Sequence, residues 1–364
     1  MIIMNIECNN ILRFKDFSMN FSYPRKINNS LITEEHLKNY NNFRYKKLNL
    51  LMGSNASGKT TFGHLLMYTL NYIYTDTPDK LLDCVNDKSK SAYVILDLVQ
   101  DHNGTYYLLR YNIKINQDKT IIKVISNCKI SNTDSYETSL GKLKEIELTK
   151  DAFRIGISWF FSYPSTLSTI TNEEKDTVLY LKILKSTLMT LDNSILDVQR
   201  LDGVKDSYII NFDSNSLIIQ EGKFIETPLL SSGTKNGLDI AESLYRIVLS
   251  KSTLFYLDDN FTHIHSELEI AFLTFMIQLL KPNSQLFFTS HNIELLEMNL
   301  PKHSYNFFKK IYDGESYKII YTNVAKYLNK NTDSVKNSYN NDLFLSLPST
   351  NLIDELLDEL SKKN

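Results

Sequence analysis

The sequence has few cysteines and almost no net charge, and both features exclude classes of protein. Three cysteines occur in 364 residues, Cys8, Cys84 and Cys128, and none forms a C-x-x-C pair. Such widely spaced cysteines fit buried thiols in a reducing compartment better than a disulfide framework. The formal net charge is −2, so there is no overall attraction to nucleic acid or to an anionic membrane, although a local basic patch stays open.

Long apolar runs and repeats are also missing. No run approaches the ~20 residues that a helix needs to cross a bilayer. The first residues lack the basic start and the cleavage site of a signal peptide. No internal repeat or heptad run is present, which argues against a long coiled-coil arm. Hydrophobic residues make up 42% of the chain and charged residues 23%, as in ordinary globular proteins. We therefore expect a cytoplasmic protein without a membrane partner.

One stretch predicts a nucleotide site. Residues 53–60 read G-x-x-x-x-G-K-T, the pattern of a phosphate-binding loop. The apolar run from Leu48 to Met52 predicts a buried strand before it, and an amphipathic helix follows to about Tyr74. In this context Lys59 would reach the β- and γ-phosphates of a nucleotide, and Thr60 would ligate Mg²⁺. A chance match in a Gly/Ser turn is the alternative. The residues expected to bind the nucleotide here are Gly53, Ser54, Asn55, Ala56, Ser57, Gly58, Lys59, Thr60 and Thr61.

A second stretch, residues 229–238, places Ser231, Ser232 and Gly233 directly before a predicted helix. A hydroxyl, backbone N–H groups and a helix N-terminus can together bind a phosphate. An ordinary serine N-cap explains the same residues. Taken alone, the stretch does not decide between these two interpretations.

Two further apolar runs predict buried strands with polar residues at their ends. Residues 253–260 place a run of apolar residues before Asp258 and Asp259. A parallel strand would deliver Asp258 to Mg²⁺ at its C-terminal edge. Residues 285–291 form the other run, which ends in His291. The alternatives are two solvated aspartates and a histidine without a catalytic role.

Together these motifs resemble those of an ABC-type ATPase of the SMC–RecF–OLD group. Residues 230–234, Leu-Ser-Ser-Gly-Thr, are similar to the family signature L-S-G-G-Q. The Asn-Ala-Ser sequence inside residues 53–60 is typical of this group rather than of transporters. The predicted strand pair ahead of that loop is typical of the group as well. The resemblance spans about residues 2–325. It extends to small head-only ATPases of bacterial anti-phage defence systems.

The resemblance implies roles for two further residues. His291 would contact the γ-phosphate, and Asp259 would stand at the position of the glutamate general base. Aspartate is shorter than glutamate by one methylene, roughly 1.5 Å, and a general base must lie within hydrogen-bond reach of its water. Slow hydrolysis, or a nucleotide-locked scaffold that barely hydrolyses ATP, therefore stays open.

The resemblance also implies partners. Two copies would enclose two ATP molecules, each between Lys59 of one chain and Ser231 of the other, with Thr60 and Asp258 as metal ligands. The implied function is an ATP-binding and ATP-hydrolysing dimeric switch that controls a separate effector protein, such as a nuclease. DNA is a further candidate partner.

Three features depart from the family pattern. The region from Ser158 to Pro164, where a Q-loop glutamine is expected, contains none. The segment from about Ser162 to Thr227 is too short for an SMC arm. Only 73 residues (364 − 291) follow His291, too few for the Toprim nuclease domain of OLD proteins. A transporter subunit is a weaker alternative, because the sequence of the phosphate-binding loop and the missing Q-loop glutamine both disfavour it.

The expected fold class is α/β, a P-loop ABC-type head with a mixed central sheet, an antiparallel β lobe and a small helical insertion. We expect an ATPase domain over residues 1–325, which contains a helical and β insertion at about 116–227, and a C-terminal extension over 326–364. A capping box at Thr171–Glu174 predicts a helix to about Leu191. Its expected core stripe is Val178, Leu181, Leu184, Leu188 and Leu191. Further expected elements are a hairpin within 2–22, a short helix at 34–39, strands at 92–98, 105–115, 120–130, 206–225, 304–309 and 317–321, and an amphipathic helix at 351–360.

Overall fold

The computed structural model describes most of the chain. The described residues are 1–24, 30–146, 158–163, 166–169 (backbone only), 176–225, 231–249, 253–328 and 333–344, together with Ile353, Leu356 and Leu360. Within these ranges, no helix is long and apolar enough to cross a membrane.

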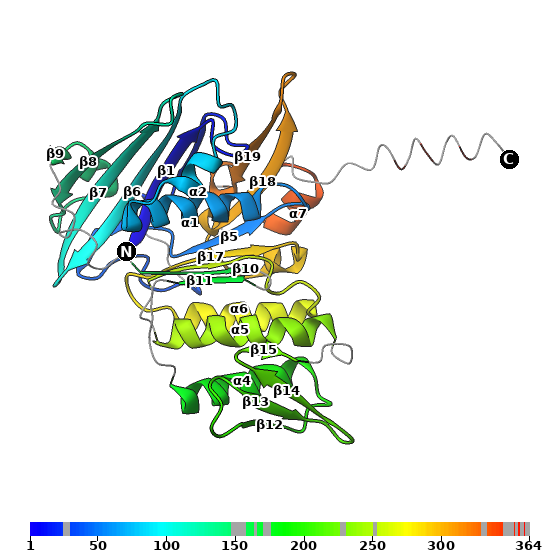
Figure 1. The fold of residues 1–364 in the computed structure, drawn as a ribbon. Helices are drawn as coiled ribbons and strands as arrows, with labels where there is room; N and C mark the ends of the chain where they lie inside the picture. Colours follow the sequence, from blue (N-terminus) through cyan, green and yellow to red (C-terminus); the bar gives the residue numbers. More distant parts are fainter. Residues whose placement is uncertain are drawn as a thin grey trace.

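A seven-stranded sheet forms the centre of the molecule (Figure 1). In spatial order its strands are β11 (Thr166–Thr169), β10 (Trp159–Tyr163), β16 (Leu254–Leu257), β17 (Gln285–Ser290), β5 (Leu48–Met52), β18 (Tyr305–Tyr312) and β19 (Tyr317–Asn323). The strands from β10 to β18 run parallel, and the outer strands β11 and β19 pair antiparallel. Every residue of β5, β16 and β17 is buried, as parallel strands covered on both faces require. The three buried strands predicted from apolar runs are confirmed.

Helices cover both faces of this sheet. On one face lies α1 (Lys59–Thr75), whose apolar stripe of Phe62, Leu65, Leu66 and Leu70 is fully buried. On the other face lie α5 (Ser232–Leu249) and α6 (Ser266–Leu279) (Figure 1). Successive strand residues point to opposite faces, so the central sheet contributes to two separate apolar cores.

A second, antiparallel sheet adjoins α1. Its strands are β2 (Phe17–Asn20), β1 (Ile2–Asn9), β6 (Ala92–His102), β7 (Thr105–Ile115), β8 (Ile121–Lys129) and β9 (Lys144–Ile146), in that spatial order. The predicted N-terminal hairpin is confirmed by the β1–β2 pairing. Between β6 and β7, Asn103 and Gly104 both have positive φ, as a type I′ hairpin turn needs. All three cysteines are buried free thiols, as expected.

A small lobe packs beneath α5 (Figure 1). It consists of α4 and a four-stranded sheet with an apolar core of its own. Leu184 and Leu188 of α4 and Tyr245 of α5 are part of that core. The elements are α4 (Thr177–Leu191), β12 (Asp197–Arg200), β13 (Tyr208–Asn211), β14 (Ser216–Gln220) and β15 (Lys223–Phe224). The other short elements are α2 (Asp79–Asp83), α3 (Tyr136–Leu140), α7 (Val335–Asn340), η1 (Ile293–Glu297), η2 (Lys302–Ser304) and η3 (Val324–Lys326).

The helix predicted at residues 34–39 is wrong. The structure has a two-stranded hairpin there, formed by β3 (His36–Leu37) and β4 (Tyr40–Arg44). Asn39 adopts a left-handed φ of 69°, which asparagine tolerates well and which interrupts a helix. Glu35 accepts hydrogen bonds from the backbone N–H of Lys47 and from His303, so tertiary contacts override the local helix propensity.

The predicted start of α4 and one of its core residues also need correction. The Thr171–Glu174 stretch lies outside the described residues, and α4 begins at Thr177 with Asp176 as its N-cap. Val178 is not core, since it is 79% exposed. The buried face is set by Tyr180, Leu184 and Leu188, and a residue two positions before Tyr180 points to the opposite side of a helix.

Candidate nucleotide site

The phosphate-loop pattern forms a tight turn between β5 and α1 at the C-terminal edge of the central sheet. Gly53 has a φ of 149°, and a Cβ there would lie 2.4 Å from the backbone oxygen of Phe308. Gly58 has a φ of 111°, and a Cβ there would lie 2.6 Å from the side chain of Ile319. Only glycine fits at either position. The β18–β19 hairpin therefore braces the loop from one side.

Lys59 folds back over this loop. Its side chain is only 4% exposed, and Nζ donates to the backbone oxygens of Gly53 at 3.0 Å and Ser54 at 3.3 Å. Nζ also lies 3.1 Å from Nε2 of His291 at the end of β17. Burial lowers the pKa of Lys59, and the charges of Asp259 and Asp258 oppose that shift. The ammonium group thus joins the loop to the end of the neighbouring strand.

Asp258 follows β16 and is 1% exposed. Its Oδ1 accepts a hydrogen bond of 3.1 Å from the hydroxyl of Thr289. Burial raises the pKa of Asp258 to about 6, a hydrogen bond from Thr60 opposes the rise, and the charge of Asp259 adds to it. A buried carboxylate whose negative charge is only partly compensated by neighbouring groups is a good ligand for a hard cation. Thr60 and Asp258 supply the oxygen atoms that Mg²⁺ prefers.

The donor set fits Mg²⁺ bound with a nucleotide rather than alone. Within the described ranges, no group of three or more His, Cys, Asp or Glu residues could hold a metal. Mg²⁺ typically takes one or two carboxylates and completes its shell with water and substrate phosphates. One carboxylate, Asp258, and one hydroxyl, Thr60, match that requirement.

Asp259 and His291 face each other across the strand ends. Oδ1 of Asp259 lies 3.7 Å from Nε2 of His291 and 3.3 Å from the hydroxyl of Thr289. The backbone N–H of Asp259 donates to the same hydroxyl at 2.9 Å. Burial, and then the charge of Lys59, lowers the pKa of His291, while Asp259 opposes the shift. A neutral imidazole can accept the hydrogen bond from Lys59 at Nε2.

The 231–233 segment lies elsewhere. The Ser231 hydroxyl accepts a 3.0 Å hydrogen bond from the N–H of Thr234, so within one chain it is an N-cap of α5. A Cβ on Gly233 would lie 3.0 Å from the backbone oxygen of His263, in the loop that follows β16. No hydrogen bond among the described residues joins this segment to residues 53–61. Ser231 and Ser232 are exposed, and Leu229 and Leu230 lie outside the described residues.

Comparisons with known proteins bear on the fold. No protein-family model matches the chain, and no curated protein matches it. Among solved structures, an SMC head bound to the C-winged helix domain of ScpA matches with a TM-score of 0.50 and 10% identity, over 90% of this chain and 100% of that chain. The chain has the fold of an SMC head. The predicted fold class, an α/β head with a mixed central sheet and an antiparallel β lobe, is confirmed.

Two other solved structures are similar. An SMC head with an extended coiled coil, bound to the C-terminal domain of ScpA and derived from Pyrococcus furiosus, has a TM-score of 0.47 and 9% identity, over 89% of this chain and 97% of that chain. The recombination mediator RecF has a TM-score of 0.39 and 13% identity, over 88% of this chain and 98% of that chain.

Three residues of the site in this SMC-head fold were not predicted from the sequence. Thr289 contacts both aspartates through one hydroxyl. Tyr256 donates a 2.7 Å hydrogen bond to the backbone oxygen of Lys59, which ties β16 to the start of α1. Gly63 leaves room for that tyrosine, since a Cβ there would lie 2.5 Å from its ring. The only sequence signal was a glycine in the middle of a helix, where it is unfavourable unless packing requires it.

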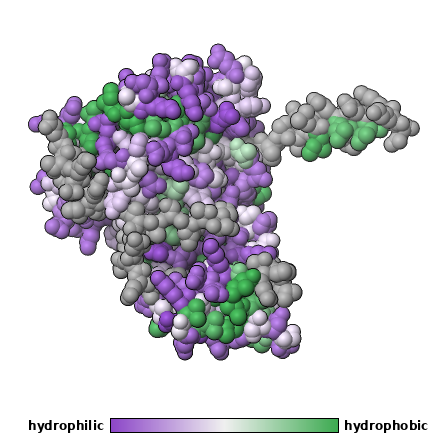
Figure 2. All heavy atoms as spheres, in the orientation of Figure 1, coloured by the Kyte–Doolittle hydropathy of each residue, from purple (hydrophilic) through white to green (hydrophobic). Residues whose placement is uncertain are grey.

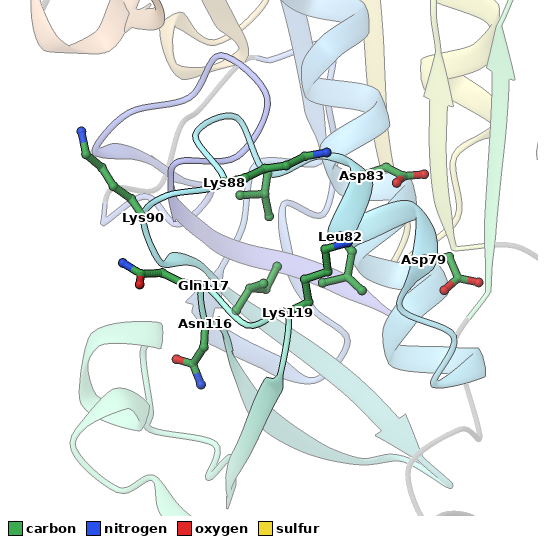
Figure 3. A pocket seen from close by; sticks show the side chains of 10 residues that line it. Asp79, Leu82, Asp83, Lys88, Lys90, Asn116, Gln117 and Lys119 are labelled. Carbon is green, nitrogen blue, oxygen red and sulfur yellow. The ribbon is translucent and has the colours of Figure 1, made fainter.

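A cavity of about 340 Å³ lies elsewhere on the SMC-head fold, between α2 and the turn after β7 (Figure 3). Carboxylates and ammonium groups both line it, among them Asp79, Asp83, Lys88 and Lys119. None of the residues expected to bind ATP lines this cavity. It is therefore separate from the candidate nucleotide site.

Proposed function

We propose that this chain binds ATP with Mg²⁺ and hydrolyses it slowly at the site between the 53–61 loop, Asp258, Asp259 and His291. The observation that carries the proposal is the position of Lys59. Its Nζ is buried at the loop and lies 3.1 Å from Nε2 of His291, and the negative charges of Asp258 and Asp259 act on it. A lysine held this way supplies positive charge where a nucleotide places its phosphates.

In this proposal the chain's own residues bind the nucleotide. Backbone N–H groups of the loop and the N-terminus of α1 attract phosphate oxygens. Lys59 would exchange the carbonyls of Gly53 and Ser54 for phosphate oxygens, a stronger charge-assisted interaction. Thr60 and Asp258 would hold Mg²⁺, which neutralises charge on the phosphates when it is bound.

Hydrolysis needs a group that takes a proton from water, and Asp259 is the candidate. Its carboxylate is half-buried at the strand end, with one oxygen near Thr289 and His291. In the proposed reaction Asp259 accepts the proton of the attacking water, and His291 contacts the γ-phosphate. Loss of a positioned general base typically costs roughly 10²–10⁴-fold in rate.

A nucleotide-locked scaffold is the second candidate, and the same carboxylate favours it. Asp259 has a left-handed φ of 49°, and Oδ1 is directed toward Thr289 at the sheet edge. A short side chain tied to its neighbours is poorly placed to reach a water beyond the γ-phosphate. In this case ATP binding would lock one conformation, and turnover would be negligible.

Steady-state phosphate release at saturating ATP and Mg²⁺ separates the two candidates. We expect measurable but slow release by the wild type, and a loss of at least 10²-fold in Asp259→Asn. Asp259→Glu, which adds one methylene, should equal or exceed the wild type. Asp259→Asn that releases phosphate as fast as the wild type would exclude Asp259 as the base. If only Asp259→Glu turns over, the scaffold candidate is correct.

The active form we propose is a homodimer with ATP at the interface. Ser231 and Ser232 are exposed at the start of α5, where a phosphate bound to a second copy could contact them. Asn55 and Ala56 at the tip of the loop are exposed as well. Light scattering of Asp259→Asn with ATP should report a dimer, and a monomer at saturating ATP would contradict the proposal.

We propose in addition that the C-terminal extension docks a separate effector protein. Ile353, Leu356 and Leu360 follow the i, i+3, i+7 spacing of one helix face and are 71%, 53% and 53% exposed. Figure 2 shows hydrophobic side chains exposed on this extension. A nuclease of an anti-phage system is the effector class that we favour, and DNA is a further candidate ligand. Removal of residues 345–364 should abolish co-purification of the effector from the host while ATP binding is retained.

A further inference from the structure

The end of β10 is fixed directly beside Asp258. The backbone N–H of Asp258 donates to the backbone oxygen of Ser162 at 2.8 Å. Nδ2 of Asn260 donates to the Ser162 hydroxyl at 2.6 Å. These two bonds hold Ser162 from both sides, so the next residue, Tyr163, has a defined position at the same sheet edge as Asp258.

The side chain of Tyr163 points to the α1 face of the sheet. Its ring lies parallel to that of Phe161 and 6.2 Å from that of Tyr256, in the core beneath α1. A Cβ on Gly63 would lie 2.8 Å from the Tyr163 hydroxyl. Gly63 is three residues after Thr60, so both lie on the same side of α1. The hydroxyl therefore lies beside Gly63, on the side of α1 that carries Thr60 one turn earlier.

This hydroxyl is buried without a partner. Tyr163 is 6% exposed, and its hydroxyl oxygen has no hydrogen bond in the described part of the chain. The neighbouring Tyr256, in contrast, donates to a backbone oxygen. Burial, followed by the negative charge of Asp258, raises the pKa of Tyr163, so the hydroxyl keeps its proton. Buried tyrosine hydroxyls usually have a partner, and the place of this one near Asp258 leaves it free to bind a group at the candidate nucleotide site.

We propose that the Tyr163 hydroxyl binds a water molecule of the Mg²⁺ hydration shell, next to Thr60 and Asp258. The inference rests on the proposed ATP–Mg²⁺ site. Mg²⁺ keeps several water molecules when it binds with a nucleotide. A buried hydroxyl at the border of the site can orient one of them and so raise metal affinity. Tyr163 is then a positioning residue, in the region where the family resemblance led us to expect a glutamine.

Tyr163→Phe removes the hydroxyl and keeps the ring. Tyr208→Phe is the matched control, because Tyr208 in the lobe also has a buried hydroxyl without a partner among the described residues. Isothermal titration with ATP over a series of Mg²⁺ concentrations gives the Mg²⁺ dependence of nucleotide affinity. We expect Tyr163→Phe to need roughly tenfold more Mg²⁺ than the wild type. Tyr208→Phe should behave like the wild type.

Two further measurements make the result specific. In EDTA, ATP affinity should be equal in Tyr163→Phe and the wild type, because the hydroxyl acts through the metal. Thermal stability without nucleotide should not fall, because an unpaired buried hydroxyl does not stabilise the protein. A Mg²⁺ dependence within twofold of the wild type would overturn the role of Tyr163 while the ATP site stands. A wild type whose ATP affinity is independent of Mg²⁺ would overturn both.

Discussion

Substitution of Asp258 by asparagine should stabilise the protein in the absence of ligand. The carboxylate is 1% exposed, and burial is the main cause that raises its pKa from 3.8 to about 6. A rise of roughly two pH units, at about 1.4 kcal/mol per unit, corresponds to about 3 kcal/mol. The folded state binds this proton more tightly than the unfolded state does. The contribution of Asp258 to stability is therefore greatest below pH 4, falls between about pH 4 and pH 6, and is constant above.

Asparagine carries no charge, so the gain should appear only where Asp258 is ionised. We expect Asp258→Asn to raise the free energy of unfolding by about 1–3 kcal/mol at pH 7.5, the lower values allowing for imperfect pairing of the amide. The gain should shrink toward zero between pH 6 and pH 4. Urea unfolding in EDTA at several pH values measures it. The same variant should lose the stabilisation that ATP with Mg²⁺ gives the wild type.

Asp97→Asn is the matched control, because a partner compensates that buried carboxylate. Both oxygens of Asp97 accept 2.8 Å hydrogen bonds from Arg110, and the Tyr136 hydroxyl donates a further bond. Loss of one charge of such a pair typically costs about 3–5 kcal/mol, less where, as here, the arginine is partly exposed. The two substitutions should therefore change stability in opposite directions at pH 7.5. If Asp258→Asn is no more stable than the wild type at pH 7.5, the charge of Asp258 is not the destabilising buried charge that we describe.

Two other substitutions test the packing and the proposed dimer. Gly63→Ala should cost about 1–3 kcal/mol in urea unfolding, because the added methyl group would clash with Tyr256 and the hydroxyl of Tyr163. Gly141→Ala, which meets no atom closer than 3.7 Å, should be neutral, and equal behaviour of the two would contradict the packing. Ser231→Arg should bind ATP as a monomer yet show no ATP-dependent dimer by light scattering, whereas Ser231→Thr should dimerise. A normal dimer of the arginine variant would exclude the segment from the interface.

The parts of the fold that the sequence predicts are those where one pattern has one physical cause. Buried parallel strands read as apolar runs because both faces are covered, and β5, β16 and β17 were found in this way. The conformation of residues 34–39 was predicted wrongly, because it depends on the pairing of Glu35 with His303, which is distant in the sequence. Its helix propensity alone carried no information about that contact.

The residues of the candidate site likewise fall into those that a local motif predicts and those that only strand pairing brings together. Lys59 and Asp258 were predicted because each belongs to a short motif at the end of a strand. Thr289 and Tyr163 were not predicted, because only the pairing of β16 with β17 and with β10 brings them to the sheet edge where Asp258 lies. Register between strands that are tens of residues apart is set by the whole sheet, and no local pattern encodes it.

The central claim is that Lys59 and its loop form the ATP site, and equilibrium binding of ATP with Mg²⁺ tests it most directly. Lys59→Ala should lose at least about 100-fold in affinity, since charge-assisted bonds to phosphate contribute about 1.5–3 kcal/mol each. Lys88→Ala, in the separate cavity of Figure 3, should bind like the wild type. Undiminished affinity in Lys59→Ala, or a loss confined to Lys88→Ala, would contradict the assignment of the nucleotide site.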